Sequence, residues 1–215
     1  MRKYSLFYLT LAIPFLIYAQ TKEENLQSKG YLFNEFLPGS VLMKSGEIET
    51  AFLNYDANNK NIAFEKNDKY LVLTNLEDID TFYISYRKFI PVEKKVYEVL
   101  LPGKISLLAS YKTKTRPLTA TVEHGGASKK ETKEVSNTVS DVYLNRKYEP
   151  NFSLDLQHEY WLVRGRSFYK ANNEKQVAKV FPEKAKEITA FVFDNAIDFK
   201  NQNDVVKLIS FCNEN

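Results

Sequence analysis

The chain has 215 residues, of which 44% are hydrophobic, 14% aromatic and 27% charged, and this argues against disorder of the whole chain, which requires few aromatic residues. Without residues 1–19, which carry two basic and no acidic residues, the formal net charge falls from +3 to +1, and this gives no global attraction toward nucleic acid or acidic lipid. We therefore expect one globular domain, or two small ones, and no binding of nucleic acid.

The N-terminus has the organisation of a secretory signal peptide. Two basic residues precede a mostly apolar run from Leu6 to Tyr18, and Ala19 offers a small residue for cleavage before Gln20. A transmembrane anchor is the alternative, but the run is interrupted by a proline and is shorter than the roughly 20 residues that span a bilayer. We expect residues 1–19 to be a signal peptide and the mature chain to be periplasmic, outer-membrane-associated or secreted, with no membrane span.

Residues 20–116 show the alternation of apolar and polar side chains that is typical of β-hairpins. Residues 31–37 are expected to form a first strand, which Pro38 and Gly39 turn into a second at residues 40–44. A break at residues 54–59 and short connections elsewhere favour antiparallel neighbours, which gives a meander of six or seven strands. Residues 70–74 are apolar on both sides and are predicted to be central in the sheet. The remaining strands are predicted at residues 48–53, 61–66, 81–89, 96–101 and 105–111.

Three cations follow the last of these strands. Lys112, Lys114 and Arg116 share one face if the strand continues, which suits a polyanion site or a sheet edge blunted by charge. The short run favours the edge. Residues 117–140 are then poor in large apolar side chains, and we expect a flexible polar loop.

Residues 141–215 are predicted to form a β-hairpin followed by short helices that pack on 20–116 as part of one domain. The hairpin joins residues 159–163 to 167–170 through Gly165. Asn173 and Asn203 are expected to cap helices, and Pro182 to begin one. The apolar stripes of these helices comprise Val177, Val180, Phe181, Ala185, Ile188, Val192, Ala196, Val205, Leu208, Ile209 and Cys212. The predicted fold class is α+β, with an antiparallel β-meander sheet covered by short C-terminal helices.

Known catalytic and metal-binding motifs are missing from the sequence. The chain has two histidines, His124 and His158, and no G-x-S-x-G elbow, zinc spacing or phosphate-binding loop. The acidic turn at residues 77–80 is expected to be solvated, and Cys212 to be a small core residue, because a lone cysteine cannot form an internal disulfide. We therefore predict no catalytic residue, cofactor or metal, although carboxylates that meet only in the fold stay open.

Exposed aromatic rings are the remaining candidates for binding. Tyr83 and Tyr86 fall on opposite parities of one predicted strand, so one of them is expected to face water. Such rings stack on sugars or contact a partner, whereas most rings pack a core. Together with Lys112, Lys114 and Arg116 they form the candidate binding surface.

Two segments carry a resemblance to a family. Residues 36–41, Gly46 and residues 53–56, and again residues 180–184 followed by two short helices, resemble exported Bacteroidetes-type proteins of unknown function over residues 36–56 and 180–212. The resemblance implies a periplasmic or outer-membrane-associated location and carries no catalytic residue.

Two functions remain open from the sequence. The first is a non-enzymatic binding or scaffold protein of the bacterial cell envelope, with an unknown protein or envelope component as its partner. The second is a carbohydrate-binding or glycoside-cleaving protein that uses surface aromatics and carboxylates. An aromatic-lined groove with two carboxylates about 5–10 Å apart would favour the second, and a flat or convex sheet face would favour the first.

Overall fold

A computed structural model describes residues 26–66, 69–117 and 152–214 of the protein. The expected signal peptide with Ala19 and Gln20, the predicted loop after residue 117 and the chain up to residue 151 lie outside these residues. Within the described part, no helix is both long enough and apolar enough to cross a membrane.

The described residues form ten strands, three α-helices and two short 3-10 helices. The strands are β1 (Leu37–Met43), β2 (Ile48–Asp56), β3 (Asn61–Lys66), β4 (Lys69–Val72), β5 (Ile79–Ile84), β6 (Arg87–Val92), β7 (Lys95–Leu101), β8 (Ile105–Pro117), β9 (Phe152–Arg164) and β10 (Ser167–Lys170). The helices are η1 (Leu26–Lys29), α1 (Glu174–Val180), η2 (Pro182–Lys184), α2 (Ala185–Asp194) and α3 (Gln202–Asn213).

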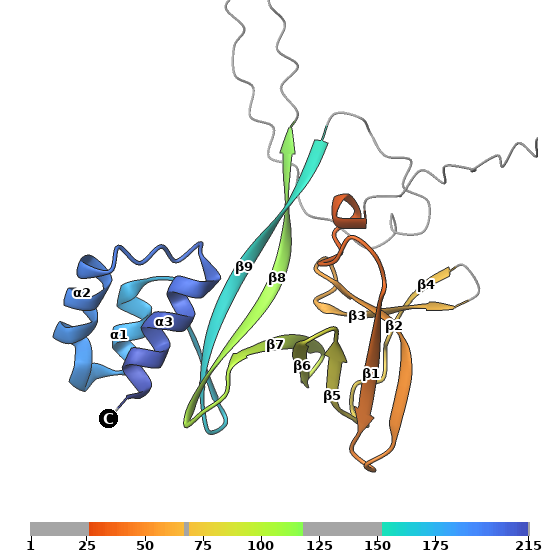
Figure 1. The fold of residues 1–215 in the computed structure, drawn as a ribbon, viewed down its shortest axis with the longest axis horizontal. Helices are drawn as coiled ribbons and strands as arrows, with labels where there is room; N and C mark the ends of the chain where they lie inside the picture. The colour runs from red at the N-terminus through yellow and green to blue at the C-terminus, as the bar shows by residue number, and fades with distance from the viewer. Residues whose placement is uncertain (1–25, 67–68, 118–151, 215) are drawn as a thin grey trace, which may run out of the picture.

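All ten strands belong to one antiparallel sheet, so the predicted α+β class is confirmed. The order is β10-β9-β8-β7-β6-β5-β1-β2-β3-β4. The predicted meander of six or seven strands is too simple, because β1 pairs with β2 on one side and with β5 on the other. Strands β2, β3 and β4 therefore follow one another on one side of β1. Strand β5 pairs with the other side of β1, and β6 to β10 follow it in order (Figure 1).

The sheet also curls, which brings β7 beside the start of β3. The amide of Val96 donates a hydrogen bond to the carbonyl of Lys60 at 2.8 Å, and the Tyr55 hydroxyl donates to the carbonyl of Val96 at 3.0 Å. We call the face that carries Tyr55, Phe89 and Tyr111 the inner face, and the opposite one the outer face. Curling encloses the inner face, where these three side chains are almost fully buried.

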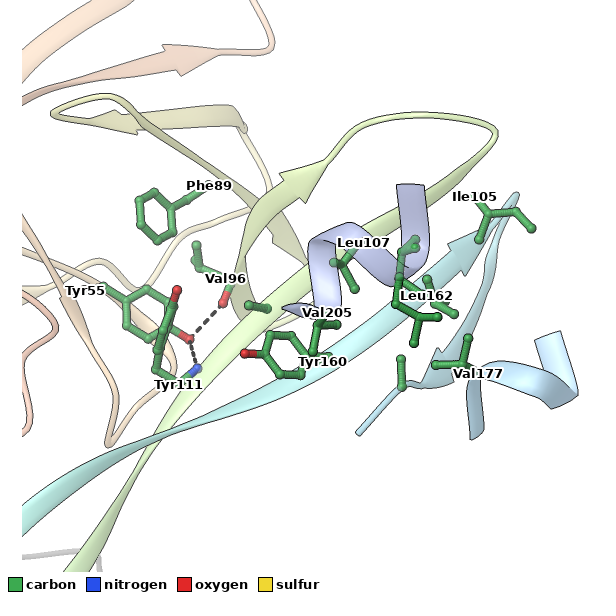
Figure 2. Packing of buried hydrophobic residues seen from close by; sticks show 14 of the residues in the cluster. Tyr55, Phe89, Val96, Ile105, Leu107, Tyr111, Tyr160, Leu162, Val177 and Val205 are labelled. Carbon is green, nitrogen blue, oxygen red and sulfur yellow. Dashed lines mark hydrogen bonds between the residues drawn. The ribbon is translucent and has the colours of Figure 1, made fainter. Parts of the chain in front are cut away.

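The helices gather beside β8 and β9, at the end of the molecule away from β1 to β4 (Figure 1). Helix α3 places Val205 beside Leu107, Tyr160 and Leu162 on the inner face (Figure 2), and Val205 and Leu208 are both 0% exposed in the same core. Burial of a large aliphatic side chain contributes about 1.5–3 kcal/mol, so this stripe is a main source of the attachment. The predicted stripes are confirmed at the buried residues Val177, Val180, Phe181, Ile188, Val205, Leu208, Ile209 and Cys212, and Ala185 and Val192 are half-buried. Ala196 was wrongly included, because α2 ends at Asp194 and Ala196 is exposed in the following turn with a φ of 47°.

The helix caps are partly as predicted. The Asn173 side chain accepts a hydrogen bond from the amide of Gln176 and caps α1. Pro182 begins η2, where its missing N–H leaves no bond unmade. The cap of α3 was predicted at Asn203, but Asn201 caps this helix and accepts from the amide of Asn203.

Residues 31–37 are not a strand, and Pro38 and Gly39 are not a turn. The Asn54 side chain supplies the hydrogen bonds that a neighbouring strand would have made, two with the backbone of Phe33 and one with the carbonyl of Glu35. Asn54 itself lies inside β2, which continues to Asp56, so the predicted break starts too early. Pro38 and Gly39 lie within β1, and Gly39 is needed there because a Cβ would stand 2.6 Å from the carbonyl oxygen of Tyr83.

The strand predicted at residues 81–89 is a hairpin. Strand β5 ends at Ile84, Ser85 and Tyr86 form the turn, and β6 begins at Arg87. Ser85 has a φ of 55°, in the left-handed region that serine rarely adopts. The turn was missed because neither glycine nor asparagine, which favour this conformation, occupies it.

The segment predicted to be central, residues 70–74, lies at the edge. Strand β4 is the last strand of the sheet, and Tyr70 and Leu71 are 39% and 41% exposed. Its apolar residues pack locally instead, because Tyr70 stacks on Phe36 with ring centroids 4.5 Å apart.

Candidate functional site

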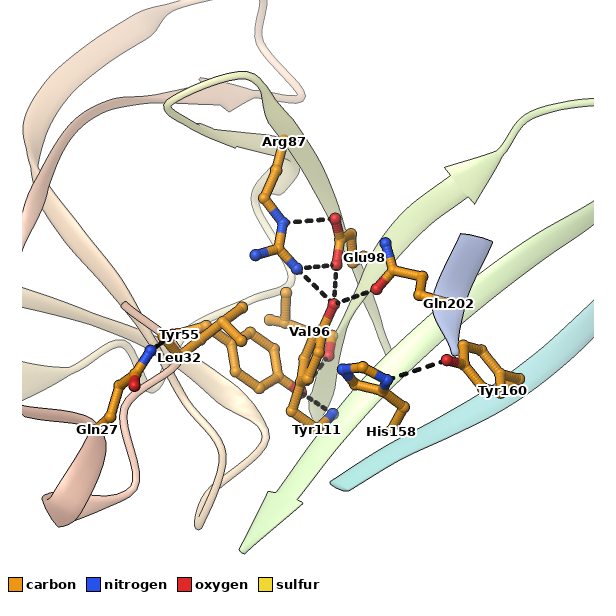
Figure 3. A network of polar contacts seen from close by, with 10 residues as sticks. All are labelled: Gln27, Leu32, Tyr55, Arg87, Val96, Glu98, Tyr111, His158, Tyr160 and Gln202. Carbon is orange, nitrogen blue, oxygen red and sulfur yellow. Dashed lines mark hydrogen bonds and ion pairs between the residues drawn. The ribbon is translucent and has the colours of Figure 1, made fainter. Parts of the chain in front are cut away.

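A polar cluster lies on the inner face, between the sheet and α3 (Figure 3). Arg87 on β6 donates from Nε to Oε1 of Glu98 on β7 at 2.6 Å and from Nη2 to Oε2 of the same carboxylate. The Tyr111 hydroxyl donates to Glu98 Oε2 and accepts from Arg87 Nη2. Gln202 Oε1 on α3 lies 3.4 Å from the same hydroxyl. We call Arg87, Glu98, Tyr111 and Gln202 the polar cluster.

Aromatic rings surround the cation of this cluster. The Arg87 guanidinium lies 5.1 Å from the ring centroid of Phe33, 5.7 Å from that of Phe89 and 5.5 Å from that of Tyr111. Burial alone would lower the pKa of Arg87, but the hydrogen bond and charge of Glu98 outweigh it and raise that pKa. Burial, reinforced by the negative charge of Glu98, raises the pKa of Tyr111. The cluster therefore holds a charged pair and a neutral phenol.

His158 joins this cluster to the segment before α3. Its Nδ1 lies 3.0 Å from the Tyr160 hydroxyl, its ring packs edge-on against Tyr111, and it is hydrogen-bonded to the backbone of Lys200. Burial lowers the pKa of His158, and the nearby Arg87 charge lowers it further against the opposing effect of Glu98. The imidazole is therefore held neutral near pH 7.

The polar cluster has the residue types of a catalytic site, but its groups are occupied by one another. The Glu98 side chain is 5% exposed, and both of its oxygens accept hydrogen bonds from Arg87 or Tyr111. Neither of the two surface hollows described below contains a residue of the cluster. This arrangement, in which each polar group is bonded to another member of the cluster, is typical of a structural network that fixes packing.

The outer face of β2, β1, β5 and β6 is apolar and weakly charged. Side chains paired across antiparallel strands share a face, and this register places alternate residues of the four strands side by side. Within the set, Lys88 alone is charged, and Ile48 and Phe52 are 65% and 56% exposed. We call this surface the outer patch; its members are Pro38, Ser40, Leu42, Ile48, Thr50, Phe52, Thr81, Tyr83, Lys88 and Ile90.

Of the two candidate tyrosines, one belongs to this patch and the other lies in an adjoining turn. Tyr83 on β5 is 40% exposed between Ser40 and Lys88 in the register. Tyr86 is fully exposed in the turn that follows β5, so the two are not on one strand as predicted. The structure thus brings both rings to one region of the surface, and both face water.

A hollow of about 700 Å³ opens at the end of the outer patch. Its lining includes four apolar residues, Leu76, Ile79, Ile90 and Pro91. Its remaining lining residues are Lys44, Glu77, Asp80, Thr81, Lys88, Glu93 and Lys94. A smaller hollow of about 360 Å³ lies elsewhere, between Leu101–Lys104 and the end of α3. Neither lining contains an aromatic ring.

Of the three predicted cations, Lys112 is held in an ion pair. Lys112 donates to Glu159 at 3.0 Å, and Lys60 donates to the other oxygen of the same carboxylate at 2.6 Å. Burial would raise the pKa of Glu159, but the hydrogen bonds from both lysines outweigh it and lower that pKa. Lys114 is exposed, and Arg116 pairs with Ser153 in the register. Among the described residues, residues 112–117 of β8 pair with β9 only, as expected for a stretch at a sheet edge.

The other residues considered for chemistry take structural positions. Cys212 is 3% exposed on α3, and burial raises its pKa to about 11. In the acidic turn, Asp78 accepts from Asn75 and Asp80 accepts from Thr81. In the described part of the chain, no three His, Cys, Asp or Glu side chains are grouped as metal ligands. His124 lies outside that part.

The polar cluster was not predicted from the sequence. One signal was available. Glu98 lies two residues after Val96 on β7, so both side chains point to the same face, where Val96 is fully buried. A charged residue on an apolar parity needs a buried partner. The identity of that partner could not be read from the sequence, because Arg87 and Tyr111 lie on other strands.

Comparison with known proteins adds no assignment: no family model, curated protein or solved structure matches this chain.

Proposed function

We propose that this chain is an exported, non-enzymatic binding or scaffold protein of the bacterial cell envelope, and that the outer patch is where it contacts a protein partner. The observation that supports this most is an exposed sheet face with two large apolar side chains, Tyr83 and a single charge, next to the turn that exposes Tyr86. Exposed apolar patches on a soluble protein typically mark interaction sites. Tyrosines are common energetic centres of such sites.

Export rests on the N-terminal pattern, and the envelope rests on the resemblance to exported Bacteroidetes-type proteins. The family itself carries no known activity to transfer. The closed polar cluster supports a non-enzymatic role, because its carboxylate and phenol are bonded to neighbours.

The carbohydrate alternative has less support. Tyr83 and Tyr86 face solvent, but neither lines a described hollow. The rings of Tyr97, Trp161 and Phe168 on the outer side of β7, β9 and β10 are tilted against one another and form no flat platform for a sugar. The planes of Tyr97 and Trp161 meet at 83°, and those of Tyr97 and Phe168 at 51°. The larger hollow has carboxylates without rings. These features favour a partner protein over a sugar.

The test is capture from native envelope extract with the tagged protein. Phe52→Ser combined with Tyr86→Ser should reduce the captured partner at least tenfold, because both side chains are exposed and neither supports the core. Phe193→Ser is the matched control, since Phe193 is 84% exposed on α2, away from the patch. Equal capture by all three proteins would contradict the proposal.

A further inference from the structure

The exposed rings of the outer face extend beyond the outer patch. Strands β4, β3, β2 and β1 are consecutive neighbours in the sheet (Figure 1). Phe52 on β2 pairs with Pro38 on β1, and Tyr70 on β4 pairs with Glu65 on β3. The β2–β3 register, continued by one residue, places Phe52 opposite Glu65. Tyr70, Glu65, Phe52 and Pro38 therefore form one row across the four strands, which we call the ring row.

The ring row ends at the turn between β5 and β6. The amide of Ser85 donates to the carbonyl of Pro38 at 3.4 Å, so this turn lies beside Pro38. Tyr86 is the next residue and is fully exposed. Tyr70 at the other end of the row and Phe52 within it also face water. An extended ligand that follows the row therefore meets three exposed rings in succession.

The spacing of the rings suits one conformation of a polypeptide. Neighbouring strands lie about 4.8 Å apart, so the backbone positions of Tyr70 and Phe52, two strands apart, are separated by roughly 9.6 Å. The same step from Phe52 leads past Pro38 to Ser85, next to Tyr86. A polyproline II helix has three residues per turn and rises about 3.1 Å per residue, or roughly 9.3 Å per turn. Side chains three residues apart in such a helix face the same way, so they meet successive rings.

The polar groups at the ring row suit a segment that lacks backbone donors. Proline has no N–H, so a proline-rich segment presents carbonyl oxygens that accept hydrogen bonds. The hydroxyls of Tyr83 and Tyr86 make no hydrogen bond with other described residues and are free to donate. The Glu65 carboxylate is exposed between Tyr70 and Phe52 and has no ion-pair partner in the described part of the chain. It therefore favours a basic residue in the segment.

We propose, as a deepening of the proposed function on which it rests, that the ring row binds a proline-rich segment of the partner protein in the polyproline II conformation. Prolines three residues apart pack against Tyr70, Phe52 and Tyr86 in turn, and a basic residue of the segment pairs with Glu65. The preformed conformation of such a segment lowers the entropy cost of ordering it. A sugar polymer fits less well, because its hydroxyls would lose water at a row whose polar side chains are Glu65 and tyrosine hydroxyls.

The experiment is selection of a random dodecapeptide phage library on the immobilised protein. Enriched peptides should carry prolines three residues apart together with an arginine or lysine. Fluorescence anisotropy of a labelled enriched peptide should show at least tenfold weaker binding to Tyr70→Ser. Tyr169→Ser is the matched control and should bind like the unchanged protein. Tyr169 is 42% exposed on the edge strand β10, whereas Tyr70 is 39% exposed on the opposite edge strand, β4.

A charge variant tests the ring row without removing a ring. Glu65→Lys should weaken binding of the same peptide at least tenfold and abolish the loss of affinity that added salt causes in the unchanged protein. Glu187→Lys, on an exposed position of α2, is its matched control and should leave both affinity and salt dependence unchanged.

Several results would overturn the inference. They are no enrichment over the empty support, enriched peptides without the proline spacing, or equal binding by the unchanged protein and either Tyr70→Ser or Glu65→Lys. Retention of the protein on insoluble cellulose that is lost with Tyr70→Ser would assign the row to a sugar polymer instead. If Phe52→Ser with Tyr86→Ser abolishes envelope capture but Tyr70→Ser and Glu65→Lys do not, the ring row fails and the proposed function stands. If none of these variants reduces capture, both fail.

Discussion

Arg87 on β6 and Glu98 on β7 form a bidentate ion pair near the start of α3, with Arg87 Nε 2.6 Å from Glu98 Oε1 (Figure 3). The Glu98 side chain is 5% exposed and the Arg87 side chain 29%. Removal of one member of such a pair leaves a buried charge without compensation, whereas removal of both members does not. The pair therefore makes the two positions energetically dependent on each other.

Arg87→Met should lower the free energy of unfolding by about 3 kcal/mol, because it leaves the Glu98 carboxylate buried with only the Tyr111 hydroxyl. The Arg87→Met, Glu98→Leu double variant should lose clearly less than the sum of its two single variants. Urea unfolding of the four proteins measures this double-mutant cycle. Additive losses would show that the pair makes no coupled contribution.

Stability should depend on His158 in mildly acidic solution. Burial lowers its pKa in the folded protein below the ordinary 6.5, so the unfolded chain binds the proton more readily. The contribution of His158 to stability is therefore full above pH 6.5 and is lost as the pH falls through the pKa of His158 in the folded protein. Charged groups facing the ring are Arg87 and Glu98, and the phenols of Tyr111 and Tyr160 remain neutral across this range.

His158→Gln keeps a polar side chain of similar reach and should flatten the fall in stability between pH 7 and pH 5. The measurement is the urea midpoint at several pH values, compared with the unchanged protein. A slope that persists in the variant would assign the acid sensitivity to other groups.

Ile188→Asp and Leu208→Asp should each unfold or aggregate the protein, because both positions are 0% exposed and an unpaired carboxylate there costs several kcal/mol. Phe193→Asp, on the same helix as Ile188 but 84% exposed, should remain folded. Circular dichroism and size-exclusion chromatography distinguish these outcomes. Native-like Ile188→Asp or Leu208→Asp would mean that the helices do not cover the inner face.

Ser85→Gly should raise the free energy of unfolding by up to about 1 kcal/mol. Ser85 has a φ of 55°, which costs a non-glycine residue roughly 1–2 kcal/mol, and the greater freedom of glycine in the unfolded chain offsets part of the gain. Ser167→Gly in β10, where φ is not positive, should instead lose about 0.5–1 kcal/mol. Thermal unfolding of both variants tests this contrast, and a lower free energy of unfolding for Ser85→Gly would show that the turn at Ser85 is unstrained.

The sequence predicted those parts of the fold that depend on local pattern. Apolar spacing located α2 and α3, Pro102 and Gly103 marked the turn between β7 and β8, and Asn173 marked the cap of α1. These features depend on residues a few positions apart. Period and turn chemistry are therefore sufficient to find them.

Features that depend on distant residues were missed. Residues 32–35 do not form a strand because the Asn54 side chain hydrogen-bonds to their backbone. Strand β1 lies inside the sheet because β5, which follows β2, β3 and β4 in the chain, pairs with its free side. Ser85 forms a turn without a turn residue, since the surrounding register imposes its φ. Periodicity alone cannot show any of these effects.

The candidate site was predicted to a similar extent. Tyr83 and Tyr86 were singled out and both are exposed, but they were placed on one strand. The remainder of the outer patch depends on strand order, which brings β2 and β5 to opposite sides of β1. Lys112 was considered as a cationic ligand, and its partner Glu159 lies 47 residues further along the chain.

The most direct test of the account is photocrosslinking in the native envelope, with p-benzoylphenylalanine in place of Tyr86 and, in a second protein, in place of Phe193. Both side chains are exposed, so neither replacement should disturb the core. The account predicts a discrete adduct with a partner protein from position 86 and none from position 193. Absence of an adduct at position 86, or equal adducts at both positions, would contradict the assignment of the outer patch as the binding surface.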